Sequence, residues 1–332
     1  MSVVAAAVLF TGVLAYAVLG GADYGAGFWD LTAGGARRGR GPRHLVDESL
    51  APVWEANHVW LIFCLVMLWT GFPTAFAAIM TTLYIPLGLA ALGIVARGAG
   101  FAFRKVMVRT EQQRLTGAAF AVSSVLAPFF LGAVVGGIAS GRVPAAGHGD
   151  PITSWVNPTS LLGGVLAVLT CAFVAAVFLT AEARRRGEPE LEAWFRRRSR
   201  VTAVVTGAVA LAGIAVLHAD APRLFDRLST RGLPLVVLSG VCGLAALLFV
   251  RRLAPRVVQG LAVLAVAAII AGWGTAQYPY LLGTHMTIAE AAAPSPTLVA
   301  LTVVAAAAFA IVVPSMALLF VLSQRGSLET SH

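Results

Sequence analysis

Long apolar segments limit what this chain can fold into more than any other feature of its sequence. Several run for about eighteen residues or more, which is enough for a helix to cross the hydrocarbon core of a membrane. Hydrophobic residues make up 58% of the 332 residues, and charged residues only 12%. We therefore predict an all-α, polytopic membrane protein that forms a single integral membrane domain over residues 1-332. The first apolar run has no basic segment before it, so we expect a retained helix rather than a cleaved signal.

The distribution of basic residues supports nine transmembrane helices. Twenty of the Lys and Arg residues lie in the odd-numbered connections and the C-terminus, and only four lie in the even-numbered ones. Because basic residues accumulate on the cytoplasmic side, we expect the N-terminus outside and the C-terminus in the cytoplasm. The net charge of +9 is then topological and does not indicate nucleic acid as a partner. The predicted helices lie roughly at 6-33, 51-69, 74-97, 115-140, 158-181, 201-218, 234-250, 257-275 and 297-322.

Cysteine and histidine are too scattered to suggest a metal or haem site. Cys64, Cys171 and Cys242 each lie alone in an apolar run, which argues against a disulfide framework or a zinc site. Of six histidines, only His58 lies clearly within a predicted helix, so a pair of axial imidazoles is hard to build. We expect this chain to bind no cofactor and no metal through its own residues.

The first predicted helix contains an acidic residue far from either end. Asp23 lies about ten residues, or about 15 Å, before the end of that helix. It shares a helix face with Gly27 and Asp30, while Gly21 and Gly25 form a small-xxx-small pair that lets another backbone approach. A carboxylate inside a membrane costs on the order of 2.5–3.5 kcal/mol, so its default interpretation is functional. The alternative is that the helix ends near Gly20 and that "GGADYGAG" is a polar turn at the membrane surface.

The second predicted helix opens with a polar cluster, "PVWEANH". Glu55 lies in its first turn, His58 follows at i+3, and Trp54 and Asn57 add further polar groups. A buried carboxylate and an imidazole can both take up and release protons near neutral pH. Because this helix begins on the predicted cytoplasmic side, Glu55, His58 and Asp23 indicate a path for protons from the cytoplasm. The alternative is an acid that interacts with the helix dipole beside an interfacial histidine.

Arg97, at the end of the third predicted helix, has two interpretations. It can neutralise one of the buried acids, or it can extend along the helix end toward the membrane surface. The sequence alone favours neither. No Walker loop, dinucleotide fingerprint or Ser-His-Asp set is recognisable.

Two motifs identify a resemblance to a known family. "GGADYGAGFWDL" and "APVWEANHVWLIF" resemble subunit II of cytochrome bd-type quinol oxidases, which carries Gly-(Phe/Tyr)-Asp-x-Gly-x-Gly in its first helix and Trp-(Asp/Glu)-Gly-Asn-x-Val-Trp-Leu in its second. "RGAGFAFR", with Arg97, and "YPYLLGTHMTIAEAAAPSPTL" are further matches, so the resemblance covers essentially the whole chain. The first two motifs place Asp23, Glu55 and Asn57 at positions that the family shares.

The resemblance implies an accessory subunit without haem, in the bacterial cytoplasmic membrane. Its partner would be a homologous subunit I that carries haems b and d and oxidises quinol while reducing dioxygen to water. Glu55 would belong to the proton route of that complex. Small accessory subunits, membrane lipid and a bound quinone are further expected partners.

The sequence also departs from the family pattern. Ala56 replaces the usual glycine of the second motif, His58 stands where Gln or Glu is common, and Ala102 lies where many relatives have an acid. Either His58 substitutes for that acid or the proton route differs. A proton-coupled secondary transporter is the competing hypothesis, because buried acids beside Gly-broken helices also mark ion sites.

Overall fold

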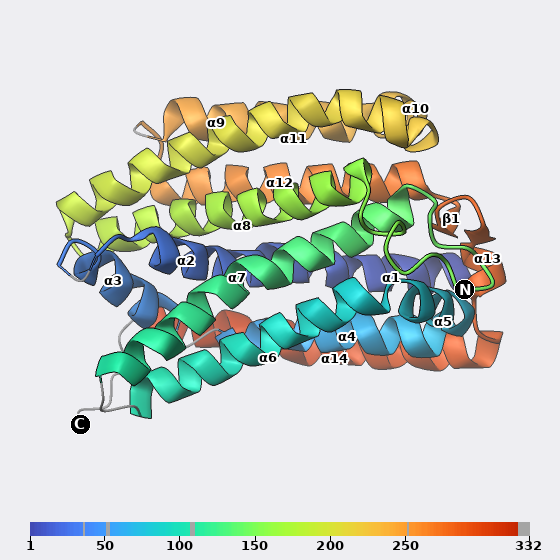
Figure 1. The fold of residues 1–332 in the computed structure, drawn as a ribbon, viewed down its shortest axis with the longest axis horizontal. Coiled ribbons are helices and arrows are strands. Elements are labelled where there is room, and N and C mark those ends of the chain that lie inside the picture. Colours follow the sequence, from blue (N-terminus) through green and yellow to red (C-terminus); the bar gives the residue numbers. More distant parts are fainter. Residues whose placement is uncertain (36, 51–53, 107–109, 251, 325–332) are drawn as a thin grey trace.

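The chain is a bundle of helices that run along one common axis (Figure 1). The computed structural model describes residues 1–35, 37–50, 54–106, 110–250 and 252–324. The described helices are α1 (Ser2–Ala15), η1 (Tyr16–Gly20), α2 (Gly21–Thr32), α3 (Arg40–Leu50), α4 (Trp54–Gly71), α5 (Pro73–Thr82), α6 (Tyr84–Val106), α7 (Thr110–Ala139), α8 (Pro158–Arg185), α9 (Pro189–Asp220), α10 (Pro222–Thr230), α11 (Leu233–Phe249), α12 (Pro255–Gln277), α13 (Ile288–Ala291) and α14 (Ser295–Gln324). Strands β1 (Tyr280–Leu282) and β2 (Met286–Thr287) pair antiparallel in one small hairpin.

The first predicted helix is continuous through Asp23. Helices α1, η1 and α2 together form one 31-residue helix from Ser2 to Thr32. The backbone stays in the right-handed helical region at Tyr16 and Gly21, where the three segments join. The middle segment, η1, is a π-helix, whose hydrogen bonds run from i to i+5 and widen the helix locally. The alternative that the helix ends near Gly20 is therefore wrong.

The helix predicted at 74-97 is wrong as a single element. Helix α5 bends 115° away from α4, and α6 begins only at Tyr84. Proline has no N–H for the helix ladder and its ring clashes with the preceding turn, so α4 ends before Pro73. Phe72 takes a non-helical conformation there (φ −138°, ψ 59°). The apolar α5 was counted with α6 because hydropathy does not register a change of helix direction.

A second corner of the same kind separates α9 from α10. Ala221 has φ −139° and ψ 60°, and Pro222 starts α10. The short α10 then bends 77° from α11. Each corner thus consists of one non-helical residue followed by a proline at the first position of a short helix, a position that proline favours.

Helix α9 starts twelve residues before the predicted boundary at 201. Its first turn carries Glu190 and Glu192, which suit the positive end of the helix dipole. Glu192 also accepts a hydrogen bond from Arg196 one turn later at 2.8 Å. Hydropathy excluded this polar stretch from the predicted transmembrane helix, yet acidic residues in its first turn and ion pairing stabilise the helix through it.

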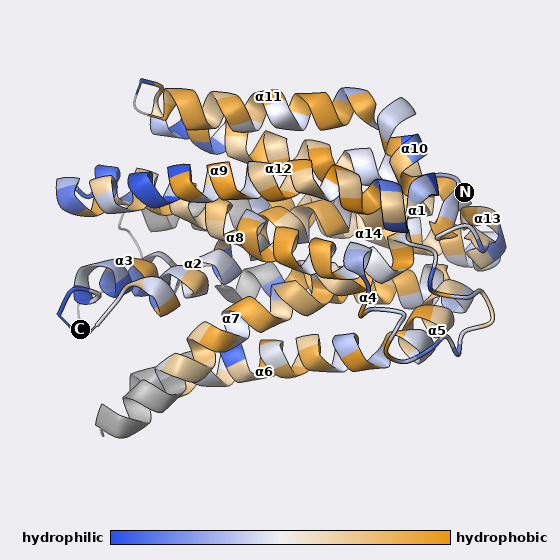
Figure 2. Cartoon of the chain, turned by 45° about the horizontal axis from the view of Figure 1, so that its top comes forward, coloured by the Kyte–Doolittle hydropathy of each residue, from blue (hydrophilic) through white to orange (hydrophobic). Residues whose placement is uncertain are grey.

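The lateral surface of the bundle is apolar, and the polar residues gather at its ends (Figure 2). In the part of the chain that the structure describes, six helices are long and apolar enough to cross a membrane, or up to eight if each bent pair counts as one. The predicted count of nine and the predicted orientation of the termini stay predictions. Helix α3 and the start of α9 lie at one end of the bundle, and α5, α10, α13 and the hairpin lie at the other (Figure 1).

Candidate functional site: a buried ion pair inside the bundle

Asp23 lies in the interior of the bundle, in the first turn of α2 after the π-helix. Its side chain is only 1% exposed, and α2 packs against both α7 and α8. The residues around it on α2 are small or aromatic, and most of the helix is buried. The sequence-based expectation of a carboxylate inside the protein is therefore confirmed.

Arg97 neutralises this carboxylate. Its Nη2 atom donates to Asp23 Oδ1 at 2.6 Å and to the backbone carbonyl oxygen of Asp23 at 3.0 Å. The Arg97 side chain is 2% exposed, so the pair is closed off from the bundle surface. Of the two interpretations of Arg97, the structure shows the counter-charge. Removing one partner of such a pair leaves an isolated buried charge, which is far more costly than burying the pair.

Aromatic rings and one hydroxyl complete the surroundings of the guanidinium. Arg97 Nη1 donates to the Ser124 hydroxyl of α7, which in turn donates to the carbonyl oxygen of Phe120 at 2.6 Å. The guanidinium carbon lies 4.5 Å from the centre of the Phe120 ring and 5.0 Å from that of Tyr24. Cation–π contacts of this kind stabilise a charge that has lost its water. The orientation of Arg97, on α6, is thus set by residues from α2 and α7.

Two glycines on α2 allow the neighbouring helices to approach this closely. A Cβ atom on Gly27 would lie 2.1 Å from the Ser124 hydroxyl and 2.9 Å from Arg97 Nη1. A Cβ atom on Gly25 would lie 1.9 Å from the backbone carbonyl oxygen of Cys171 in α8. Both positions therefore require glycine for space. The small-residue face predicted around Gly25 is confirmed as the contact between α2 and α8.

The pair is not fully satisfied by hydrogen bonds. Among the described residues, neither Asp23 Oδ2 nor Arg97 Nε has a hydrogen-bond partner, although both atoms are buried. Buried polar atoms without a partner are uncommon and call for an explanation. In a membrane protein with buried ionisable groups, the free oxygen is a position where a proton or a water can bind.

His58 is the second predicted site residue that the structure brings to this region. Its ring lies 6.5 Å, centre to centre, from that of Tyr24, in an edge-to-face arrangement. His58 is also within electrostatic range of Asp23. Glu55, Trp54 and Asn57 belong to the first turn of α4, but their side chains lie outside the described residues. Their predicted roles remain predictions.

Asp30, the other acid on this face of α2, has a partner of its own. Arg43 of α3 donates from Nε to Asp30 Oδ1 at 2.9 Å, and its Nη2 atom donates to the carbonyl oxygen of Gly34 at 2.6 Å. This pair fixes the turn between α2 and α3. It lies at the end of the bundle that holds α3 and the start of α9, which is the basic end (Figure 1). The sequence showed Arg43 only as one of the basic residues in the first connection between helices, and its spacing from Asp30 gave no sign of the contact.

Sequence reasoning also missed the uncharged residues of the site. Ser124 and Phe120 on α7, and Tyr24 and Tyr16 on the first helix, all contact the ion pair or one another. A search for charges in apolar segments passes over hydroxyls and rings. The signal available in the sequence was the position of Tyr24 directly beside Asp23.

The described residues hold no cluster of side chains that could bind a metal ion. No three His, Cys, Asp or Glu side chains within the described ranges gather as ligands. The His58 ring packs on Tyr24, and His285 contacts the backbone carbonyl oxygen of Gly141 at 2.9 Å in the loops.

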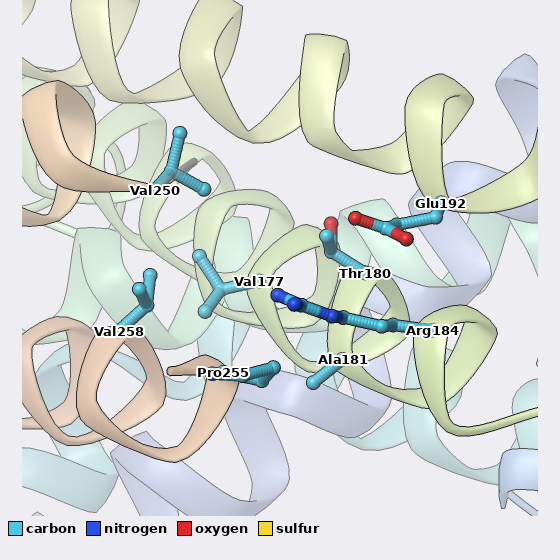
Figure 3. Close-up of a pocket in the computed structure, with 8 residues that line it drawn as sticks. All are labelled: Val177, Thr180, Ala181, Arg184, Glu192, Val250, Pro255 and Val258. Atoms are coloured by element: carbon cyan, nitrogen blue, oxygen red, sulfur yellow. The ribbon is translucent and has the colours of Figure 1, made fainter. Parts of the chain in front are cut away.

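A pocket lies apart from these residues, between α8, α9 and α12. Arg184, Thr180 and Glu192 form its polar side, and Val177 and Val258 are among the apolar residues opposite (Figure 3). The pocket has room for about one water molecule, which is too little for a substrate.

The fold and the site together define a class of protein. Long apolar helices around a buried ion pair are typical of a polytopic helical membrane protein. The chain matches the family model for cytochrome bd terminal oxidase subunit II over residues 1–323, and it belongs to that family. It is a multi-pass protein of the bacterial cytoplasmic membrane.

Individual proteins of this kind are similar to the chain in sequence and in fold. The chain is similar to cytochrome bd ubiquinol oxidase subunit 2 of Bacillus subtilis (strain 168), with 26% identity over 249 residues, which are 74% of this chain and 70% of the relative. It is 28% identical over 222 residues to cytochrome bd-I ubiquinol oxidase subunit 2 of Escherichia coli (strain K12), covering 63% of this chain and 56% of that one. A chain in the structure of bd oxidase from Geobacillus thermodenitrificans shares the fold, with a TM-score of 0.77 at 24% identity over 97% of this chain and 98% of that chain.

Proposed function

We propose that this chain is the haem-free accessory subunit of a cytochrome bd-type quinol:oxygen oxidoreductase. The match to the subunit II family over residues 1–323 carries this proposal. In the complex, a subunit I partner would hold haems b and d, take electrons from quinol and reduce dioxygen to water. This chain would support that partner in the membrane, with its apolar lateral surface against the partner and lipid.

The second part of the proposal is a proton route from the cytoplasm. Reduction of dioxygen to water consumes protons, and these would have to reach a redox centre in the partner within the membrane. Glu55, in the first turn of α4, would receive protons at the basic end of the bundle, and His58 would pass them toward Asp23. The contact between the rings of His58 and Tyr24, directly beside Asp23, supports this order.

The ion pair gives Asp23 a defined part in this route. Arg97 occupies Oδ1 and compensates the charge of the carboxylate, while Oδ2 stays available to a proton or a water. Arg97 is thus a supporting residue, and Trp54 and Asn57 are proposed to hold the first turn of α4. An imidazole ring has two nitrogens, one of which can accept a proton while the other releases one, and this suits His58 to transfer between two carboxylates.

The test is the substitution Glu55→Gln in the intact oxidase complex. The amide keeps the size of the side chain but cannot carry a proton, so we expect quinol-driven oxygen consumption to fall at least about tenfold. The haem absorbance spectrum should stay unchanged, because no haem ligand is altered. Oxygen uptake with a soluble quinol measures the effect.

The matched control is Asp150→Asn. Asp150 is an exposed acid in the loop before α8, and its Oδ1 atom accepts hydrogen bonds from the backbone N–H groups of Ile152 and Thr153. An asparagine can accept the same bonds, so turnover should match that of the unsubstituted complex. If Glu55→Gln leaves oxygen consumption at the level of this control, the proton route through Glu55 is ruled out.

A further inference from the structure

Two tyrosines in the first helix form a hydroxyl pair that the proposed proton route does not yet include. The Tyr16 and Tyr24 hydroxyl oxygens lie 3.0 Å apart and share a hydrogen bond. Tyr24 is 3% exposed, so its hydroxyl is buried in the bundle. Either hydroxyl can donate while the other accepts, as the transfer of a proton along a chain requires.

The π-helix brings these two residues together. Successive residues of an α-helix turn by about 100°, so side chains eight positions apart point about 80° away from each other. Segment η1, from Tyr16 to Gly20, lies between the two tyrosines and turns less per residue, which reduces this offset. The Tyr24 side chain leans toward the N-terminus, as helical side chains do, and meets Tyr16. Local π-helices frequently occur at functional sites.

Tyr24 connects this pair to the candidate site. Its ring faces the Arg97 guanidinium at 5.0 Å and meets the His58 ring at 6.5 Å between centres. It also follows Asp23 directly in the chain. Tyr24 therefore contacts both His58 and the partner of Asp23.

Tyr16 extends this connection toward the surface of the bundle. It lies eight residues, or about 12 Å, farther from the basic end than Tyr24. Gly12, four residues earlier on the same face, packs against Phe63 and Cys64 of α4. Tyr16 is partly exposed, whereas Tyr24 is not. The hydroxyl pair thus extends from the buried site to a residue that is partly exposed, halfway along the first helix.

We propose that Tyr24 and Tyr16 relay protons from the site around Asp23 and His58 to the partner subunit. This inference rests on the proposed function, because it extends the same route. A proton that reaches the Tyr24 hydroxyl oxygen releases the hydroxyl proton of Tyr24 to Tyr16, and Tyr16 releases its own proton onward. Each ring is neutral before and after the transfer, and no oxidant or reductant is needed.

The test is Tyr16→Phe and Tyr24→Phe in the intact oxidase complex. Phenylalanine keeps the ring contacts with His58 and Arg97 and removes only the hydroxyl. We expect each variant to slow quinol-driven oxygen consumption about tenfold and to raise the ratio of rates in H₂O and D₂O, because a proton transfer becomes limiting. The haem spectrum should match that of the unsubstituted complex.

Tyr84→Phe is the matched control, since Tyr84 is 56% exposed at the start of α6, and it should change neither rate nor isotope ratio. Unchanged oxygen consumption in both Tyr16→Phe and Tyr24→Phe would overturn the relay. The proposed function would still stand if Glu55→Gln lowers oxygen consumption. Slow turnover with an unchanged isotope ratio would assign the hydroxyls a structural role and also overturn the relay.

Discussion

At the scale of single residues, the buried pair of Asp23 and Arg97 is the feature on which the site depends. Each charge has lost its water, and each is stabilised by the other within 2.6 Å. Phe120 and Tyr24 cover the guanidinium, so Arg97 has no space in which to reach solvent. The contributions of the two residues to stability are therefore coupled, so the effect of substituting one depends on whether the other is present.

This coupling predicts that Arg97→Gln lowers the stability of the folded chain more on its own than in combination with Asp23→Asn. The single variant leaves a buried carboxylate without a counter-charge, which costs about 3–5 kcal/mol. The double variant removes both charges and should recover a large part of that loss. The fraction of chain that stays folded after heating in detergent, measured by size-exclusion chromatography, gives the comparison.

Arg43→Gln supplies the reference for an ion pair at the bundle end. The side chains of Arg43 and Asp30 are 29% and 5% exposed, against 2% and 1% for Arg97 and Asp23, so this pair keeps more of its water and the loss of stability should be smaller. The pair would not be coupled if the double variant at Asp23 and Arg97 lost as much stability as the two single variants lose in sum.

At the scale of elements, the contact between α2 and α8 determines where the ion pair lies. Trp29 of α2 donates from its indole nitrogen to the carbonyl oxygen of Ala172 at 2.9 Å, one turn of the helix beyond the close approach at Gly25. Glycine at position 25 and a long-range hydrogen bond at position 29 hold the two backbones together. Helix packing in membranes depends on such small residues because lipid supplies no hydrophobic driving force between helices.

Gly25→Ala should therefore destabilise the bundle. Its methyl group would lie 1.9 Å from the carbonyl oxygen of Cys171, and backbone cannot move aside as a flexible side chain can. We expect a loss of about 1–3 kcal/mol or more, typical of an overpacked interior. A lower midpoint in thermal unfolding of the purified chain in detergent measures it.

Gly207→Ala is the matched control for that substitution. Gly207 lies inside α9, and no atom lies within 4 Å of the position its Cβ would take. Alanine favours helix over glycine by about 1 kcal/mol, so stability should stay equal or rise. A midpoint for Gly25→Ala that equals that of Gly207→Ala would contradict the close helix contact.

At the scale of the whole molecule, hydropathy and charge predicted the helical bundle and the burial of Asp23, because both follow from the cost of placing polar groups in lipid. They did not predict the α4–α5 corner, which depends on Pro73, or the polar start of α9, which depends on acids in its first turn and on local ion pairs. They also left Arg97 undecided and missed Tyr16 and Ser124, because partners on other helices are brought close only by the packing.

The predicted orientation can be tested with single cysteines at two acidic positions. Asp150 and Glu190 are both exposed, and they lie in connections that the positive-inside rule assigns to opposite sides of the membrane. We expect Asp150→Cys to react with a membrane-impermeant maleimide in spheroplasts, and Glu190→Cys to react only in inverted vesicles. The unsubstituted chain, whose cysteines lie within helices, gives the background. The opposite labelling pattern would reverse the proposed topology.

The π-helix between Tyr16 and Gly20 also determines where the first helix can lose a residue. Elsewhere in this helix, the loss of one residue turns its two halves against each other by about 100°. Within η1 the same loss can be absorbed by a return to α-helical geometry, because about five residues of a π-helix turn through the same angle as four residues of an α-helix. The contacts on the N-terminal side, from Ala5 to Gly12, would then keep their neighbours.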